Sequence, residues 1–209
     1  MSDLAGEAER SRAAKLALRS RMLTARRSLS PSARRLAAAQ LQDQTLSFVR
    51  REHPSTVAAY VPVGPEPGGH DLPDHLASTG VRVLLPVLLE DNDLDWAEFT
   101  GDLTAGPRGL SEPTGPRLGV EALAGAELVL APALAVDLSG RRMGRGGGSY
   151  DRALARTTGL VVALLNDDEL IETVPAEPHD RPVHGVITPR RGFVALPSAG
   201  AWSGRNDLR

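Results

Sequence analysis

Apolar residues in the first quarter of the chain recur at the spacing of a helix. From Ser11 to Arg27 they lie among many arginines, which is typical of a basic amphipathic helix. The apolar positions of this predicted helix are Leu16, Met22 and Leu23. Ser30 and Pro31 then form a helix start signal, because a serine caps free amides and a proline fits the first turn. A second helix is expected over residues 31–51, with an apolar stripe at Leu36, Leu41, Thr45, Phe48 and Val49.

Beyond residue 55 the apolar residues come in short runs, which are typical of buried strands. Strands are expected at residues 57–61, 81–85, 128–131, 160–165 and 183–188, and Pro86 is expected to end the second of them. An alternating pattern at 94–99 predicts an edge strand, and helical segments are expected at 71–78, 123–126 and 150–156. Strands that alternate with helices predict an α/β fold with a mainly parallel sheet and helices on both faces.

Three long segments between these elements are expected to be loops, namely residues 62–70, 100–119 and 132–148. They follow the carboxyl ends of predicted strands, where open α/β sheets bind ligands. The composition shows no break that would mark a second domain. We therefore expect one domain over residues 11–194, a disordered N-terminus at 1–10 and a mobile C-terminal tail at 195–209.

The composition excludes several classes of function. The 209 residues include 24 basic and 26 acidic side chains, so no net basic charge indicates a nucleic acid or a membrane as partner. The absence of cysteine excludes disulfides, cysteine-bound metals and a thiol nucleophile. Neither a membrane-length apolar run nor a signal peptide is present, so a cytoplasmic location is expected. Among all the basic residues Lys15 is the only lysine, which composition alone does not explain.

The most informative segment is a glycine-rich loop between residues 137 and 152. Four of the five residues from Gly144 to Gly148 are glycine, and arginines lie within and beside this run. Glycine lets backbone N–H groups approach a ligand, and arginines add charge, so the segment suits a phosphate group. A flexible surface loop is the simpler alternative, but it leaves the interleaved arginines unexplained. The usual phosphate-loop motif is excluded because no lysine is present, and the dinucleotide motif because Ser149 replaces its third glycine.

Two carboxylates lie close to this loop or to a predicted strand. Asp151 begins the helix after the loop, where it either caps the helix or holds a divalent metal ion on bound phosphates. Asp180 is a second candidate, with an ordinary solvated side chain as the alternative. The five histidines show no metal-binding spacing, and no nucleophile elbow of the G-x-S-x-G type is present.

Residues 140–152 resemble the late glycine loop of the 5-formyltetrahydrofolate cyclo-ligase family, also called 5,10-methenyltetrahydrofolate synthetases. Further pieces resemble that family in the same order along the chain: Lys15–Arg19, Tyr60–Pro62 with Glu66, Leu84–Pro86, Glu112-Pro113, Val129–Asp137, Pro175, His179-Asp180 and Ile187-Thr188. Each piece is short, but the ordered set spans residues 12–190 and is specific. The resemblance implies a three-layer α/β/α sandwich.

The resemblance also implies a site and a reaction. ATP would be bound by Lys15, Arg19, Arg142, Met143, Gly144, Arg145, Gly146, Gly147, Gly148, Ser149 and Tyr150. The folate would be bound by Arg19, Val61, Glu66, Arg145, Gly146, Gly147, Gly148 and Ser149. Lys15 and Arg145 would be catalytic, and magnesium would lie at Asp151 and Asp180. The implied reaction converts 5-formyltetrahydrofolate and ATP to 5,10-methenyltetrahydrofolate, ADP and phosphate.

These residue types suit that chemistry. Phosphorylation of the formyl oxygen creates a good leaving group, which departs when N10 attacks the formyl carbon and closes the ring. Phosphoryl transfer depends on positioning and charge neutralisation, which arginine, lysine, backbone amides and magnesium supply. Glu66 would hold the pterin, because a carboxylate accepts hydrogen bonds from an aminopyrimidinone. The expected partners are therefore small molecules, and the expected state is a monomer or a weak homodimer.

The chain departs from the family pattern at three positions. Val136 replaces an aromatic residue, Ser149 replaces a tyrosine, and Met143 replaces a leucine. A non-catalytic member that binds nucleotide or RNA is one alternative hypothesis. A sugar-phosphate isomerase or an enzyme related to the CoA-transferases is another.

Overall fold

The computed structural model describes residues 2–175 and 181–197, with side chains from Glu9 onward. Within these residues, seven strands form one sheet in the order β12-β11-β9-β6-β1-β2-β3. These strands are β1 (Thr56–Ala58), β2 (Arg82–Leu88), β3 (Leu94–Glu98), β6 (Leu128–Pro132), β9 (Leu160–Leu164), β11 (Gly185–Thr188) and β12 (Gly192–Ala195). Neighbouring strands are parallel except at the two edges, where β3 and β12 are antiparallel to their partners.

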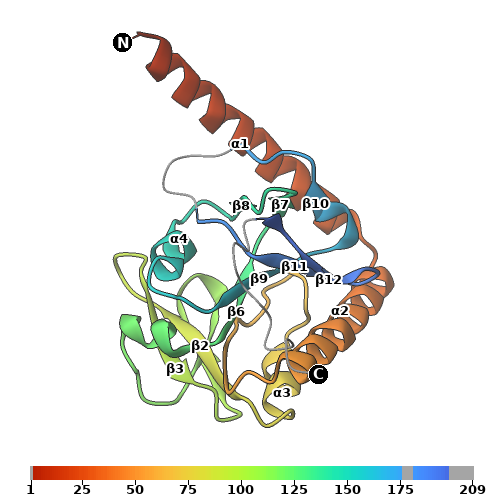
Figure 1. Cartoon of the computed structure of the whole chain (residues 1–209), viewed down its shortest axis with the longest axis vertical. Helices are drawn as coiled ribbons and strands as arrows, with labels where there is room; N and C mark the ends of the chain where they lie inside the picture. Colours follow the sequence, from red (N-terminus) through yellow and green to blue (C-terminus); the bar gives the residue numbers. More distant parts are fainter. Residues whose placement is uncertain (1, 176–180, 198–209) are drawn as a thin grey trace.

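Alternating residues along each central strand face two separate hydrophobic cores. On one face, Val57 and Leu130 pack with α2 (Pro31–Glu52) and α3 (Leu72–Ala77). On the other face, Ala58 and Val129 pack with the 3-10 helix η2 (Val120–Gly125) and with α4 (Ser149–Leu154). Figure 1 shows α2 and α3 on the opposite side of the sheet from α4. The predicted three-layer α/β/α sandwich with a mainly parallel sheet, and the predicted edge strand at 94–99, are therefore confirmed.

Two segments that were expected to be loops contain secondary structure. Residues 100–119 contain a hairpin of β4 (Leu103–Ala105) and β5 (Ser111–Pro113), joined by the 3-10 helix η1 (Pro107–Gly109). Residues 132–148 contain β7 (Ala135–Asp137) and β8 (Arg142–Met143). The last two strands form a small second sheet with β10 (Leu170–Ile171), which follows the 3-10 helix η3 (Asp167–Glu169). These strands are too short to show an apolar period in the sequence.

The prediction that Pro86 ends the second strand is wrong. β2 instead continues to Leu88. Its parallel pairing with β1 ends at Leu84, so the backbone N–H that Pro86 lacks is not needed for pairing on that side. On its other side Pro86 pairs with Trp96 of β3. Strands β10 and β12 were not expected from the sequence.

The predicted first helix is present and is longer than expected. Helix α1 (Ser2–Ser28) includes residues 2–10, and Figure 1 shows its N-terminal half projecting from the body of the molecule. At the other end, β12 extends to Ala195 and the next residue, Leu196, is buried. Disorder of residues 1–10 and mobility of 195–209 in solution stay predictions. None of the helices in the described part of the chain is long and apolar enough to span a membrane.

The predicted apolar stripe of the second helix is correct except at one position. Leu41, Thr45, Phe48 and Val49 are buried, whereas the side chain of Leu36 is 62% exposed. At about 100° per residue, Leu36 lies about 140° around the helix from Leu41, so it faces away from the sheet.

Candidate active site

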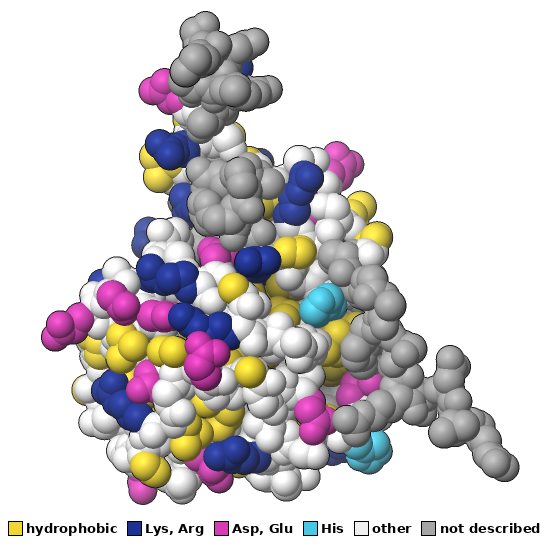
Figure 2. All heavy atoms as spheres, turned by 60° about the vertical axis from the view of Figure 1, so that its left-hand side comes forward, with side chains coloured by type: hydrophobic (Ala, Val, Ile, Leu, Met, Phe, Trp, Pro, Cys, Tyr) yellow, Lys and Arg dark blue, Asp and Glu magenta, His cyan; other side chains and the backbone are white. Residues whose placement is uncertain are grey.

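A cavity of about 370 Å³ lies between α1 and the carboxyl ends of β1 and β6. Its lining comes from segments that are far apart in the sequence. The lining residues are Lys15, Arg19, Arg26, Tyr60, Val61, Glu66, Pro86, Leu88, Leu94, Arg108, Leu110, Ser111, Pro132–Leu134 and Arg142–Asp151. Figure 2, which brings the left-hand side of Figure 1 forward, shows basic and acidic side chains interleaved below the projecting helix.

This cavity brings together nearly all the residues that the sequence analysis selected. Every predicted ATP-binding and folate-binding residue lines it, and so does Asp151. Asp180 lies outside the described residues. Of the two predicted magnesium ligands, the structure therefore describes only Asp151. Within the described residues, no group of three or more histidine, aspartate or glutamate side chains forms a metal site.

The side chains of α1 that line the cavity are basic, and none of them is a leucine. Lys15 and Arg26 are only 4% and 2% exposed, whereas Leu16 is 68% exposed. The expected stripe through Leu16 is therefore wrong, although Met22 of that stripe is buried and Leu23 is partly buried. The helix adopts this orientation because the surface beneath it offers carbonyl and carboxylate oxygens that long basic side chains can reach.

Arg26 anchors α1 through a buried ion pair. Its Nε and Nη2 donate to the two carboxylate oxygens of Glu169 at 2.7 and 2.8 Å, and Nη2 also donates to the carbonyl oxygen of Ala133 at 2.5 Å. Burial alone lowers the pKa of Arg26, but the hydrogen bond and the charge of Glu169 outweigh it and raise the pKa above its usual value. The C-terminal part of α1 is thereby fixed to the cavity wall.

A second contact joins α1 to the glycine loop. The Nε of Arg19 donates to the carbonyl oxygen of Gly144 at 3.1 Å. Gly146 has a φ of 102°, and a Cβ atom there would lie 3.3 Å from Cζ of Arg19. A side chain at Gly146 would therefore be strained and would also press on this arginine. The glycine is needed for the close approach of helix and loop.

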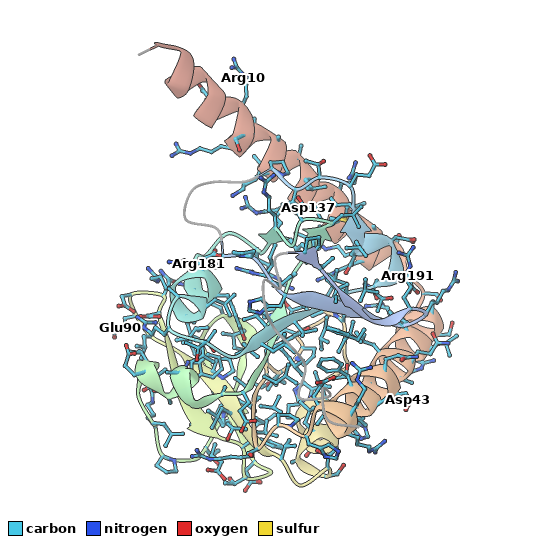
Figure 3. All side chains as sticks on the ribbon, in the orientation of Figure 1. Arg10, Asp43, Glu90, Asp137, Arg181 and Arg191 are labelled. Atoms are coloured by element: carbon cyan, nitrogen blue, oxygen red, sulfur yellow. The ribbon has the colours of Figure 1, made fainter. Side chains whose placement is uncertain are left out.

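Asp151 does not cap α4. The N-cap of this helix is Gly148, which has no side chain to accept a hydrogen bond. Oδ1 of Asp151 accepts instead from Nη2 of Arg142 at 2.6 Å, and the backbone N–H of Arg181 lies 3.5 Å from the same oxygen. Figure 3 shows Arg181 beside α4. The cap alternative for Asp151 is therefore wrong, and both of these contacts of its carboxylate with described residues involve Oδ1.

Arg142 links the glycine loop to the central sheet. It is 4% exposed, and its Nη1 donates to the carbonyl oxygen of Pro132, at the end of β6, at 3.2 Å. Its Nε is buried and has no hydrogen-bond partner among the described residues. One N–H of this buried guanidinium thus stays unsatisfied among the described residues.

Glu66 is held by the loop that follows β1. Its Oε2 accepts the backbone N–H of Val63 at 2.8 Å, and its Oε1 forms an ion pair with Nε of Arg145 at 3.1 Å. The hydroxyl of Tyr60 donates to the carbonyl oxygen of Pro67 at 3.0 Å, which steadies the same loop. Burial, aided by the nearby charge of Glu66, raises the pKa of Tyr60 well above its usual value. The backbone N–H of Val63 and the guanidinium of Arg145 therefore hold the carboxylate of Glu66 in position.

The three departures from the family pattern lie in different environments. Val136 is fully buried in the core and does not line the cavity. Met143 and Ser149 do line it. The neighbouring Asp137, labelled in Figure 3, organises the turn after β7 by accepting from the side chain of Ser139 and from three backbone amides. Burial raises its pKa, but these hydrogen bonds outweigh burial and lower it.

Several lining residues are not among those expected from the sequence. Arg26 follows Lys15 and Arg19 at helical spacing, so its periodicity was an available signal. Arg108 lies in the β4–β5 hairpin, which was expected to be a loop, and only the tertiary structure brings it to the cavity. Three leucines also line the cavity: Leu88 from β2, Leu94 from β3 and Leu110 from the β4–β5 hairpin.

A three-layer α/β fold with a cation- and glycine-lined cavity at its strand ends is typical of α/β enzymes, and the lining suits an anionic ligand. Residues 11–189 match the model of the 5-formyltetrahydrofolate cyclo-ligase family. The chain belongs to this family, and it is an enzyme of the folate ligase class.

Relatives and solved structures agree with this assignment. A 5-formyltetrahydrofolate cyclo-ligase from Mycolicibacterium smegmatis is 46% identical over 187 residues, which cover 86% of this chain and 95% of the relative. The structure of a 5,10-methenyltetrahydrofolate synthetase from Aquifex aeolicus has a TM-score of 0.72 at 25% identity and covers 93% of this chain and 99% of its own. A synthetase of that name from Mycoplasma pneumoniae shares the fold, with a TM-score of 0.68 at 19% identity, over 84% of this chain and 98% of its own.

Proposed function

We propose that the enzyme uses ATP and magnesium to convert 5-formyltetrahydrofolate to 5,10-methenyltetrahydrofolate, with release of ADP and phosphate. The observation that carries this proposal is the composition of one cavity. Cations and the glycine loop line the cavity, and so does the fixed carboxylate of Glu66, which pairs with Arg145. The cations suit a polyphosphate, and the carboxylate suits the amino and N–H groups of a pterin. A cytoplasmic location, where ATP and folates are available, fits this function.

On the phosphate side, Lys15 and Arg145 are the proposed catalytic residues. Lys15 is buried in the cavity wall, where a compact ammonium suits a single phosphate oxygen. Arg145 lies on the exposed part of the loop and pairs with Glu66, so it joins the proposed phosphate and folate regions. Together with Arg19 and the loop amides, these groups neutralise the charge that is transferred with the phosphoryl group.

On the folate side, we propose that Glu66 holds the pterin and that Val61 packs against it. Leu88, Leu94 and Leu110 provide an apolar wall for the aromatic ring beyond the pterin. With both substrates bound, the formyl oxygen attacks the γ-phosphorus and ADP leaves. N10 then attacks the formyl carbon, the C–O bond breaks, and phosphate departs as the ring closes. The protein supplies no side-chain nucleophile and acts by positioning.

The carboxylate of Asp151 fits a magnesium ion. Magnesium in nucleotide sites is commonly bound by one or two carboxylates together with substrate phosphates and water. Oδ1 of Asp151 accepts from Arg142, which orients the carboxylate, and Oδ2 would bind the ion. Asp180 is the proposed second ligand. The ion would reduce the negative charge on the phosphate oxygens.

A direct assay tests the proposed function. The protein is mixed with magnesium, ATP and 5-formyltetrahydrofolate, and the absorbance of the methenyl product is followed together with ADP release. We expect equimolar formation of the two products and loss of both when magnesium is chelated. If the folate binds but no product forms, the protein is a non-catalytic family member. If neither ATP nor the folate binds, the proposal is wrong.

Replacement of Asp151 by asparagine is expected to weaken the magnesium dependence. The neutral amide is a poorer ligand, so the magnesium concentration for half-maximal turnover should rise about tenfold or more. The measurement is turnover during a magnesium titration at saturating ATP.

Asp93→Asn is the matched control for this variant. Asp93 also pairs with an arginine, Arg156, at 2.6 Å, but it does not line the cavity. We expect this control to lose thermal stability and to keep the magnesium dependence of the wild type. If Asp151→Asn behaves in the same way, the carboxylate serves only to hold Arg142.

A further inference from the structure

One arginine of the cavity lining has no partner among the residues that the structure describes. Arg108 lies at the tip of the β4–β5 hairpin, is exposed, and lines the cavity together with Leu110 and Ser111 of the same hairpin. The other lining arginines each contact a protein oxygen, and they are Arg19, Arg26, Arg142 and Arg145. Arg108 can therefore bind a ligand without giving up a contact within this part of the chain.

The turn at the hairpin tip does not itself account for an arginine at this position. Two backbone hydrogen bonds close the turn: the N–H of Gly106 donates to the carbonyl oxygen of Leu110 at 2.8 Å, and the N–H of Leu110 donates to that of Pro107 at 3.1 Å. Between them Arg108 has a φ of 57°, in the left-handed region that residues with a side chain rarely adopt. Glycine would adopt this backbone without strain, so the side chain of Arg108 is a cost to the turn.

The hairpin is joined to the strands that carry the apolar part of the lining. Glu112 of β5 is only 8% exposed, and its Oε1 accepts the backbone N–H of Leu88 at 2.9 Å. Leu88 of β2 pairs in turn with Leu94 of β3, and both leucines line the cavity. Leu110 and Arg108 therefore belong to the same connected part of the fold as these leucines.

The parts of a folate beyond the pterin have chemistry that suits this combination. The aminobenzoyl ring is aromatic, and the glutamate carries two carboxylates that are charged at neutral pH. A guanidinium can bind a carboxylate through two parallel N–H groups. We propose that Arg108 binds a carboxylate of the glutamate, so that the β4–β5 hairpin makes the enzyme prefer folates over compounds that end at the aromatic ring. This inference rests on the proposed function of the same cavity.

A phosphate of ATP is the competing partner for this arginine. The cations that we assign to ATP belong to other elements, Lys15 and Arg19 to α1 and Arg145 to the glycine loop. Arg108 instead shares its hairpin with Leu110, which we assign to the folate. The carboxylate is therefore the favoured partner, and kinetics with each substrate separate the two.

Arg108→Ala, assayed with two substrates, tests the inference. The substrates are 5-formyltetrahydrofolate and 5-formyltetrahydropteroate, which lacks the glutamate. We expect the KM for the folate to rise about fivefold, the value of an ion pair at an exposed site. The KM for the pteroate and the KM for ATP should stay within twofold of the wild type, because neither compound offers the glutamate carboxylate. Binding of the two compounds, measured by calorimetry, gives the same comparison without turnover.

Three further variants separate the charge of Arg108 from the shape of the hairpin. Arg108→Gly suits the left-handed backbone, so it should melt close to the wild type and still show the higher KM for the folate. Arg108→Lys keeps the charge and should restore the KM in part. Arg117→Ala is the matched control, because Arg117 is exposed and does not line the cavity, and it should leave both KM values unchanged.

An equal rise in KM for the folate and the pteroate in Arg108→Ala would overturn the inference, since the effect would then not depend on the glutamate. A rise in the KM for ATP alone would assign Arg108 to a phosphate and would overturn it as well. Failure of the proposed function is distinguishable, because the wild type itself would then form no methenyl product.

Discussion

Lys15→Ala is expected to raise the apparent KM for ATP roughly 10- to 100-fold, the loss that follows from removing one charge-assisted hydrogen bond. Lys15 is buried in the cavity wall on the same side of α1 as Arg19, which contacts the glycine loop. An ammonium in this position can reach a phosphate oxygen with little competition from water. The KM for the folate should change much less, since Glu66 lies on a different element.

Two further variants make this test specific. Arg21→Ala removes a positive charge from an exposed position of the same helix, so it should leave the KM for ATP unchanged. Lys15→Arg keeps the charge but introduces a wider planar group, and we expect it to restore affinity only in part. An unchanged KM in Lys15→Ala, measured on a variant that melts as the wild type does, would remove Lys15 from the phosphate site.

Arg26→Ala is expected to lower the free energy of unfolding by about 3–5 kcal/mol, because it leaves the carboxylate of Glu169 buried without its counter-charge. Both side chains of the pair are almost fully buried, at 2% and 6% exposure. The same change removes the hydrogen bond to the carbonyl oxygen of Ala133. Since Arg26 anchors the helix that carries Lys15, the affinity for ATP should fall as well. Urea unfolding and ATP kinetics measure the two effects.

Arg82→Ala is the control for an exposed ion pair of similar length. Arg82 and Glu98 lie 2.8 Å apart with side chains that are 46% and 43% exposed, so the loss should be within about 1 kcal/mol. The double variant Arg26→Met with Glu169→Leu should recover part of the stability, because it leaves no unpaired buried charge. A loss in Arg26→Ala as small as that of Arg82→Ala would contradict the anchoring role.

Much of the fold could be predicted because its signals are local. Residues 128–131 and 160–165 are continuous apolar runs, and such runs become central strands wherever both faces of a sheet are covered. The helix start at Ser30 and Pro31 is likewise local, and the structure shows the side chain of Ser30 accepting the N–H of Ala33. The β4–β5 hairpin and strands β7, β8 and β10 gave no such signal, since two or three residues cannot display a period.

The features of the candidate site likewise depend partly on local sequence and partly on contacts between distant segments. The sequence alone determined the α/β class and the family resemblance, and it singled out the glycine loop as a candidate anion-binding segment, because these depend on residue types and on spacing within one segment. Only the tertiary structure decided which side of α1 faces inward, that Asp151 binds Arg142 instead of capping a helix, and that Arg26 anchors α1. Arg26 and Glu169 are 143 positions apart, and Arg19 and Gly144 are 125 apart. A helix of leucines and arginines has two possible buried sides, and the choice between them depends on partners that such distant segments supply.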